Sequence, residues 1–211
     1  MITADQVLDL ILRQYAPGGE NAPPLRRRLD QTDLLQVLPH TMQTLVFRNT
    51  DPTRPGIRIS RVFDSGCIID HLPVIKNGQL FTYNSCLIAI LWKDRQRREL
   101  SFVHELVHMF SSGAWRIDRD EIIHVTGIAE HIYEIENGAA VRRRSRNVQL
   151  NERITDLLAE EFLIRISDSG HDACFDPAPS ELCRRYFSND VTLAGDSALL
   201  DAAGIRINSE I

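Results

Sequence analysis

The stretch His104-Glu105-Leu106-Val107-His108 is the part of this sequence that decides its fold class. In an α-helix, with 3.6 residues per turn, residues four apart share a face and lie about 6 Å apart along the axis. Two imidazoles placed in this way can bind one metal ion. The pattern HExxH on a helix predicts a zinc site in which the glutamate acts on the metal-bound water. We therefore expect zinc on His104 and His108, with Glu105 as the general base.

The residues on both sides of this motif predict that it lies inside a long helix. Apolar residues recur at spacings of three and four, which is typical of a helix with one buried face. These residues are Leu100, Val103, Leu106, Val107 and Phe110. No proline or glycine occurs between Asp94 and Ser112, so we expect the helix to continue to Gly113 and end there.

A catalytic zinc ion usually takes three protein ligands and keeps a fourth position for water, so one more ligand is required. The metzincin pattern HExxHxxGxxH is excluded, because Ser111 and Ala114 stand where that pattern has glycine and histidine. Residues 148 to 163 predict a second amphipathic helix, with Asn151 as its capping residue. The third ligand is therefore sought on this second helix.

Glu152 lies in the first turn of the second expected helix and is the predicted third zinc ligand. Asp156 follows four residues later and so lies on the same face. A carboxylate beside a zinc site commonly accepts the second ring N–H of a ligand histidine and so orients that ring. We expect Asp156 to have this role.

These two segments together resemble a known group of peptidases. HELVH at residues 104 to 108, followed by NERITDLLAEE at residues 151 to 161, resembles the gluzincin pattern HExxH…ExxxD. The sequence is most similar to the ImmA/IrrE-type zinc metallopeptidases and the related lethal-factor-like peptidases, and the lead-in over residues 97 to 103 is also similar. The resemblance covers residues 74 to 163, which is under half of the chain. The separation of 44 residues between His108 and Glu152 is longer than a minimal gluzincin needs.

The resemblance implies a zincin-like fold and a ligand set of His104, His108 and Glu152. It also implies that Glu105 is the general base and Asp156 the orienting carboxylate. A regulatory protease that acts on one or a few proteins, such as a repressor, is the activity implied. A secreted effector that cleaves a host protein is also compatible with the pattern.

The rest of the sequence predicts an α+β fold. Helices are expected near residues 3 to 15 and 30 to 46, within an N-terminal helical segment of residues 1 to 50 that precedes a zincin-like domain of residues 51 to 211. Short strands are expected at residues 57 to 63, 67 to 69, 73 to 75 and 80 to 83. Strands directly before the zinc helix suit a small mixed sheet covered on one face by that helix, with an edge strand free to pair with an extended peptide.

Further strands are expected between the two zinc helices, at residues 121 to 127, 130 to 135 and 139 to 144. The turn signal Asn137-Gly138 makes the last two an inserted β-hairpin. A hairpin beside a zinc cleft can shape substrate access, so we expect it to influence specificity. Short helices are expected at residues 179 to 187 and 197 to 203.

Other polar residues have less certain roles in this pattern. Four residues are open candidates for stabilising the oxyanion: His124, His131, Tyr133 and Tyr186. Each of the two histidines could instead be a rival metal ligand or an ordinary surface residue of a strand. Three histidines have no neighbour at ligand spacing: His40, His71 and His171. The basic run from Arg142 to Arg146 fits either contact with phosphates or an acidic substrate, or a solvated hairpin strand.

The composition narrows the class of partner. A net charge of −5 and a pI near 5.8 give no general attraction to nucleic acid or to an anionic membrane. The acidic first residues and the lack of a long apolar run indicate a cytoplasmic protein, or an effector exported without a classical leader. The four cysteines, which form no CxxC pair, are expected to be buried thiols and not disulfides: Cys67, Cys86, Cys174 and Cys183.

The sequence as a whole predicts a zinc-dependent hydrolase that cleaves a peptide bond in a protein or peptide substrate. The alternative is a zinc-containing sensor or protein-binding module without catalysis. Both hypotheses require the metal, and they differ in whether Glu105 is needed. The identity of the substrate and the oligomeric state are left open by the sequence.

Overall fold

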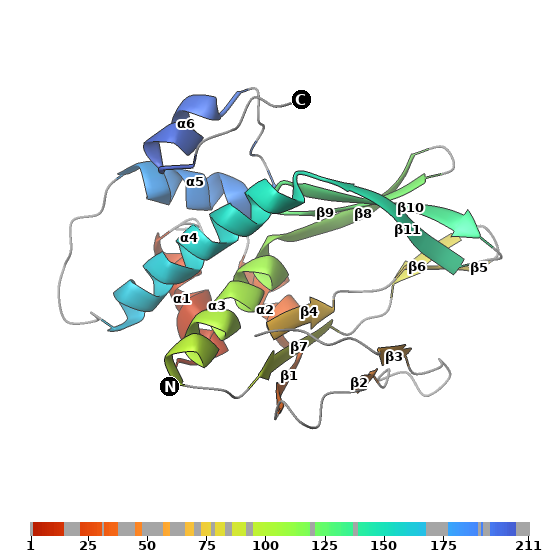
Figure 1. The fold of residues 1–211 in the computed structure, drawn as a ribbon, viewed down its shortest axis with the longest axis horizontal. Coiled ribbons are helices and arrows are strands. Elements are labelled where there is room, and N and C mark those ends of the chain that lie inside the picture. Colours follow the sequence, from red (N-terminus) through yellow and green to blue (C-terminus); the bar gives the residue numbers. More distant parts are fainter. Residues whose placement is uncertain are drawn as a thin grey trace.

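The computed structural model has a mixed α+β fold (Figure 1). It describes the backbone of residues 2–14, 22–30, 32–37, 45–47, 57–59, 66–69, 73–76, 79–82, 86–91, 95–118, 121–136, 139–167, 177–189, 191 and 195–205. It describes the side chains of residues 2–13, 25–30, 98–113, 121–134, 141–167, 181–189, 191 and 195–205. None of the described helices is both long enough and apolar enough to pass through a membrane.

Two long helices form the centre of the molecule. Helix α3 (Arg95–Ser111) contains the HExxH motif, and α4 (Val148–Ser167) packs against it. The apolar spacing of three and four places one face of each helix in the core, as the sequence predicts. The most deeply buried side chains of this pair are Val103, Leu106, Val107, Phe110, Ile154, Leu158 and Phe162. Burying a side chain of this size stabilises the fold by about 1.5–3 kcal/mol, so the two helices have a fixed relative position.

The end of α3 passes directly into a strand, β8 (Ser112–Asp118), so the expected end of the helix near Gly113 is confirmed and the strand is new. Asn189 binds the end of the helix, since its Nδ2 donates a hydrogen bond to the carbonyl of Ser111 at 2.8 Å. A Cβ atom at Gly113 would lie 2.9 Å from Asn189 Oδ1 and 3.1 Å from the Val125 carbonyl. A larger residue here would therefore require the Asn189 side chain to shift.

The start of α4 corrects one prediction. The helix begins at Val148, and the amide of Asn151 donates a hydrogen bond to the carbonyl of Asn147 at 2.9 Å. Asn147 has a positive φ of 57°, a conformation that asparagine tolerates better than most residues. The expectation that Asn151 caps the helix is therefore wrong, because Asn147 makes the turn from strand to helix. Glu152 accordingly lies in the second turn.

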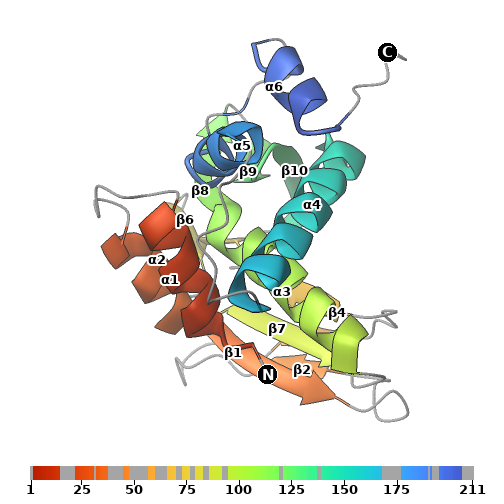
Figure 2. The same ribbon diagram turned by 90° about the vertical axis from the view of Figure 1, so that its left-hand side faces the viewer.

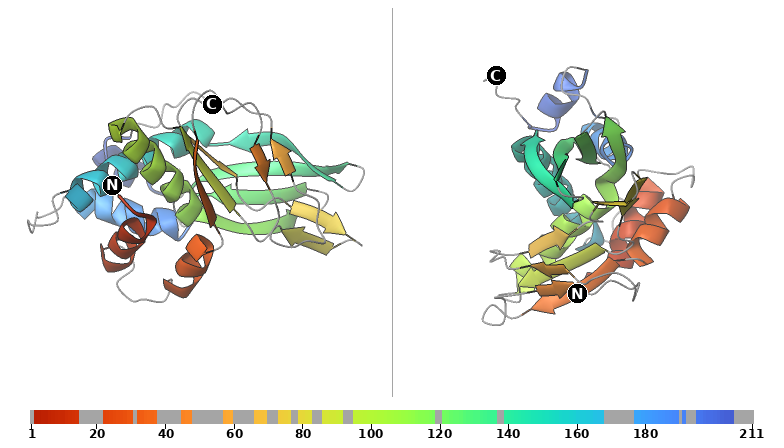
Figure 3. Two further views of the ribbon diagram at one scale, coloured as in Figure 1. Left: turned by 90° about the horizontal axis from the view of Figure 1, so that it is seen from below. Right: turned by 90° about the vertical axis from the view of Figure 1, so that its right-hand side faces the viewer.

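The larger sheet of the molecule has six strands in the order β6-β5-β11-β10-β9-β8. Besides β8 it contains β5 (Pro73–Lys76), β6 (Gln79–Thr82), β9 (Glu121–Thr126), β10 (Ala129–Glu136) and β11 (Ala139–Arg146). All neighbours in this sheet are antiparallel, and a single pair, Ala139 with Val74, joins β11 to β5. Figure 3 shows the strands β8 to β11 extending away from the helices. The strands and hairpin expected between the two zinc helices are confirmed.

A smaller, mixed sheet contains β1 (Thr32–Val37), β7 (Cys86–Leu91) and β4 (Gly66–Ile69), in the order β1-β7-β4. β1 is parallel to β7, and β4 is antiparallel to it. Helix α3 contacts both β4 and β7. The strands β2 (Leu45–Phe47) and β3 (Ile57–Ile59) pair separately. The strands expected from residue 57 to residue 83 are therefore present, some of them shorter than predicted.

The N-terminal part contains one confirmed helix and one correction. Helix α1 (Ala4–Gln14) lies where the sequence predicts it, and α2 (Ala22–Asp30) contains the two prolines in its first turn, where proline is tolerated. Both helices lie beside α3 (Figure 2). The helix expected over residues 30 to 46 is wrong: residues 32–37 form β1, because pairing with all six residues of β7 overrides a weak local preference. The division of the chain at residue 50 remains a prediction.

Two short helices complete the described part of the chain. Helix α5 (Pro177–Phe187) and α6 (Ser197–Ala202) lie where the sequence predicts them. α5 contacts α3, and its Leu182 and Tyr186 side chains are fully buried in the same core as α3 and α4. This packing brings the Tyr186 hydroxyl close to the start of α4.

Candidate metal centre

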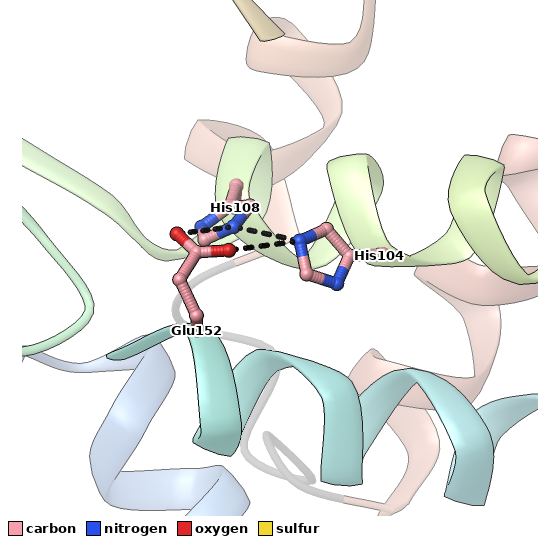
Figure 4. Close-up of side chains that lie close together, drawn as sticks. All are labelled: His104, His108 and Glu152. Atoms are coloured by element: carbon pink, nitrogen blue, oxygen red, sulfur yellow. Dashed lines mark hydrogen bonds and ion pairs between the residues drawn. The ribbon is translucent and has the colours of Figure 1, made fainter. Parts of the chain in front are cut away.

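Helices α3 and α4 bring three potential metal ligands to one point (Figure 4). His104 and His108 project from one face of α3, and Glu152 reaches them from α4. The two histidine Nε2 atoms are 3.0 Å apart. His104 Nε2 lies 3.3 Å from Glu152 Oε2, and His108 Nε2 lies 3.4 Å from Glu152 Oε1. The three residues predicted as ligands from separate parts of the sequence therefore lie together.

The spacing of these atoms fits a tetrahedral zinc ion. Zinc binds histidine nitrogen and carboxylate oxygen at about 2.0–2.1 Å, so ligand atoms at tetrahedral angles are about 3.3–3.4 Å apart. The three sides of the triangle, 3.0, 3.3 and 3.4 Å, are close to that value. The Glu152 side chain is 47% exposed, against 17% for His104 and 9% for His108. The triangle is therefore accessible to solvent on the side of Glu152, as a site with a water position requires.

Asp156 fixes the orientation of one ligand ring. Its Oδ1 lies 2.8 Å from His104 Nδ1, at the distance of a charge-assisted hydrogen bond. A neutral imidazole carries one N–H, so donation from Nδ1 to this carboxylate leaves the lone pair on Nε2. In that tautomer Nε2, which lies 3.0 Å from His108 Nε2 and 3.3 Å from Glu152 Oε2, is the atom that can bind a metal ion. The contact between Asp156 and a ligand histidine is the one expected from their shared position on the second helix.

Asn151 lies in the core close to the second ligand ring. It is buried, and its Oδ1 accepts hydrogen bonds from the Ile128 amide at 3.0 Å and from the Tyr186 hydroxyl at 2.8 Å. These two donors identify the oxygen, so the amide nitrogen Nδ2 faces His108 Nδ1, at 3.5 Å. This distance is too long to fix the tautomer of the His108 ring. Asn151 therefore positions the start of α4 more than it orients His108.

Sequence reasoning missed this role of Asn151 because the residue type favours a cap. The position carried a usable signal, since Asn151, Ile154, Thr155 and Leu158 recur at helical spacing and form the buried face of α4. A polar side chain on a buried face needs hydrogen-bond partners, and Asn151 finds them on β10 and α5.

The charges around the centre favour a cation. Burial lowers the pKa of His104, but the hydrogen bond with Glu152 and the charges of Glu105 and Asp156 outweigh it, and its pKa is raised. Hydrogen bonds from His104 and then from His108 hold the pKa of Glu152 well below its usual range. Glu105 is itself buried, 7% exposed, and lies on α3 next to His104. Three carboxylates thus lie near the two imidazoles, and one of them, Glu152, completes with His104 and His108 a group that could hold a metal ion.

Tyr186 has a structural position. Its side chain is fully buried, its hydroxyl donates to Asn151, and Thr155 Oγ1 lies 2.9 Å away. Burial raises the pKa of this phenol, so it stays protonated. A Cβ atom at Gly127, where φ is +58°, would lie 2.3 Å from the Tyr186 ring, so glycine is required for this packing. The hydroxyl of Tyr186 therefore forms its hydrogen bonds with Asn151 and Thr155 inside the protein.

The two strand histidines differ in exposure. His124 is buried, and its Nε2 lies 3.0 Å from Ser112 Oγ. His131 lies opposite it on β10 and is partly exposed, with Nδ1 2.9 Å from Ser145 Oγ. The two rings stack with centroids 6.4 Å apart. Tyr133 lies two residues further along β10 and is partly buried. Of these residues, His131 is the one that combines solvent access with a place beside the candidate centre.

The electrostatics of His131 show its closeness to that centre. Burial and then the charge of Arg142 lower the pKa of its ring. The charges of His108 and Glu152 also act on it, in opposite directions. His131 therefore lies near the candidate centre, on the part of β10 that follows Ile128, whose amide donates a hydrogen bond to Asn151 of α4.

The remaining predicted residues are only partly described. Cys183 is a free, buried thiol, as expected, and burial raises its pKa. The side chains of Cys67 and Cys86 lie outside the described residues, as do four whole residues: His40, His71, His171 and Cys174.

Comparison of the chain with protein-family profiles, with curated proteins and with solved structures finds no match. The function of the site therefore has to be argued from its own geometry.

Proposed function

We propose that this chain is a zinc-dependent peptidase with a zincin-like arrangement of its two ligand helices. The observation that carries the proposal is the triangle of His104, His108 and Glu152, with sides of 3.0–3.4 Å. The contact of Asp156 with His104 Nδ1 and a buried carboxylate at Glu105 support it. The order of these groups in the chain also resembles the gluzincin pattern, most closely that of the ImmA/IrrE type.

The mechanism follows from which residues flank the triangle. Zinc bound by His104, His108 and Glu152 would supply a Lewis acid for the scissile carbonyl and would lower the pKa of water to about 7. Glu105 accepts the proton of the attacking water and passes it to the leaving amine. Its burial beside His104 keeps the carboxylate in position for both transfers. Asp156 holds the His104 ring in the ligating tautomer throughout.

The surroundings of α3 suit an extended peptide substrate. The helix contacts β4 and β7, and β4 lies at one end of the described mixed sheet β1-β7-β4. An edge strand can form backbone hydrogen bonds with a peptide and so present its carbonyl groups to a neighbouring site. We propose that the substrate is a specific protein, cleaved in the cytoplasm or after export of the chain as an effector.

Metal analysis combined with a search for new protein termini tests this proposal. Purified wild type should contain one zinc per chain, and cells that express it should contain new termini that are absent with Glu105→Gln. The matched control is Glu160→Gln. Glu160 is an exposed glutamate on α4, about two turns after Glu152, and its substitution should leave the zinc content and the cleavage unchanged. Wild type without zinc, or identical termini with wild type and Glu105→Gln, would contradict the proposal.

The alternative is a zinc-containing binding module. It predicts stoichiometric zinc and no cleavage by the wild type, and a partner protein bound equally by wild type and Glu105→Gln. The same experiment therefore separates the two functions.

A further inference from the structure

The basic run on β11 divides into two groups. The strand carries four arginines, at positions 142, 143, 144 and 146, and all four are exposed. Three of them form ion pairs with glutamates of β9 and β10. These pairs are Arg143 with Glu134 at 3.1 Å, Arg144 with Glu121 at 2.8 Å, and Arg146 with Glu130 at 3.4 Å. Arg142 has no carboxylate partner among the described residues.

A β-bulge explains why Arg142 differs from its neighbours. The register of β10 with β11 shifts after Ile132, so that Ile132 lies opposite Arg144 and Tyr133 lies opposite Arg142. Arg143 is the extra residue of the bulge. Bulges change the direction of side chains and are frequent beside active sites. Without the shift, Arg143 would lie opposite Tyr133, and Arg142 would lie on the other face of the sheet.

The register places Arg142 on the same face as His131. Successive residues of a strand point to opposite faces, so His131 and Tyr133 share a face, and directly paired residues share it with them. His131 pairs with Ser145, and Tyr133 pairs with Arg142. The glutamates at 130 and 134 point to the opposite face, with their arginine partners. One face of this hairpin is therefore neutralised, and the other carries a single unpaired cation.

The face with the unpaired cation includes His131, which lies near the end of β10 that meets the start of α4, where the Ile128 amide donates a hydrogen bond to Asn151. The charges of His108 and Glu152 both act on His131, and so does the charge of Arg142. Arg142 lies opposite Tyr133, two residues along the strand from His131, which is about 7 Å. An extended peptide has the same rise per residue. An extended substrate that passes over this face of β10, an inner strand of the sheet, would therefore bring to Arg142 a group about two residues away from the one opposite His131.

We propose that Arg142 binds a carboxylate of the substrate, and so makes this chain select acidic segments for cleavage; the inference rests on the proposed function. The carboxylate belongs either to an Asp or Glu side chain or to the C-terminus of a peptide. A guanidinium forms two parallel hydrogen bonds with a carboxylate, a geometry that lysine cannot supply. The chain has a net charge of −5, which disfavours acidic substrates in general. A cation near the cleaved bond, such as Arg142, would therefore be needed for an acidic substrate to bind.

Cleavage of a random peptide library by the zinc-loaded protein tests the inference, with products identified by mass spectrometry. Wild type should prefer Asp or Glu at one fixed distance from the cleaved bond, by about ten- to a hundredfold in kcat/KM. If the C-terminal carboxylate is the group bound, the preference should instead disappear with amidated peptides. Arg142→Gln should remove the preference, and Arg142→Glu should replace it with one for Lys or Arg. The matched control is Arg143→Gln, on the neutralised face, which should keep it.

Peptide binding provides a readout that does not depend on turnover. In a zinc-loaded Glu105→Gln background, the best-cleaved acidic peptide should bind about ten- to a hundredfold more weakly when Arg142 is also changed to Gln. The same peptide with Gln in place of its acidic residue should bind both proteins equally. A wild type with no acidic preference, or an Arg142→Gln variant that keeps it, overturns this inference and leaves the proposed peptidase function intact. A zinc-loaded wild type that cleaves no peptide overturns both.

Discussion

The helix side and the sheet side of the candidate centre are built differently. On the helix side, the predicted ligands stand on α3 and α4, whose apolar faces are buried in one core. On the sheet side, β10 and β11 carry exposed charged residues and a bulge. The difference fits the division of roles that we propose. A metal centre needs positions fixed to a few tenths of an ångström, whereas a selecting surface needs a charged group that a partner can reach.

Breaking the chemistry of the helix side should give the largest effect. Glu105→Gln keeps the size of the side chain but removes its ability to accept a proton, so kcat should fall by about 10²- to 10⁴-fold. Zinc content should stay at one per chain, because Glu105 is not among the three converging ligand atoms. Steady-state kinetics on a cleavable peptide, together with metal analysis, measure both quantities. Unchanged kcat in Glu105→Gln would remove the general base from the mechanism.

Breaking the support beneath the helix side should cost stability. Asn151→Ala removes the acceptor for the Ile128 amide and the Tyr186 hydroxyl, both of which are buried. A buried donor without a partner costs about 1–3 kcal/mol, so the free energy of unfolding should fall by about 2–4 kcal/mol. Denaturant titration measures this change. Asn147→Ala does not serve as a control, because its φ of 57° is itself strained for alanine.

A suitable control for the Asn151 experiment is Gln149→Ala, because Gln149 is exposed and lies two residues before Asn151 on the same helix. It should change the free energy of unfolding by less than about 0.5 kcal/mol. Equal losses in the two variants would mean that the hydrogen bonds of Asn151 do not hold the start of α4.

Loosening a single ligand ring should have a moderate effect. Asp156→Asn keeps the shape of the side chain but weakens the acceptor for His104 Nδ1–H, so zinc affinity should fall by about 10- to 100-fold. Competition with a zinc chelator measures the affinity. The control is Asp201→Asn, an exposed aspartate on α6. Equal affinity of Asp156→Asn and wild type would show that the contact does not orient the ligand.

The smallest predicted effect is a pH dependence of stability at alkaline pH. Burial raises the pKa of Tyr186 above its ordinary value of 10.0, so the folded state favours the protonated phenol. The stabilisation is fully present below pH 10 and declines as the pH rises above 10 toward the folded pKa. Wild type should therefore lose more stability than Tyr186→Phe between pH 9 and pH 11. Parallel curves of unfolding free energy against pH for the two proteins would contradict the burial of this hydroxyl.

The helix side could be predicted from the sequence because its information is local. The HExxH pattern places His104 and His108 on one face of the first helix, and the spacing of Glu152 and Asp156 places both on one face of the second. Only the contact between the two helices had to be assumed. The structure brings all four side chains together. The position of α3 and most of α4 follows from apolar residues at spacings of three and four.

The features that could not be predicted depend on partners distant in sequence. β1 is a strand because β7, more than 50 residues later, pairs with it. Asn151 lies inside the helix because Ile128 and Tyr186 bind its side chain. The bulge that separates Arg142 from the other arginines exists only in the pairing of β10 with β11. Local propensity carries no record of such contacts.

Zinc-edge X-ray absorption of the purified protein tests the central claim most directly. The account predicts one zinc per chain with two imidazole nitrogens and one or two oxygens at about 2.0–2.1 Å. In Glu152→Gln the oxygen contribution or the zinc content should fall. Absence of zinc from the wild type, or sulfur ligands at about 2.3 Å, would contradict the centre built by His104, His108 and Glu152.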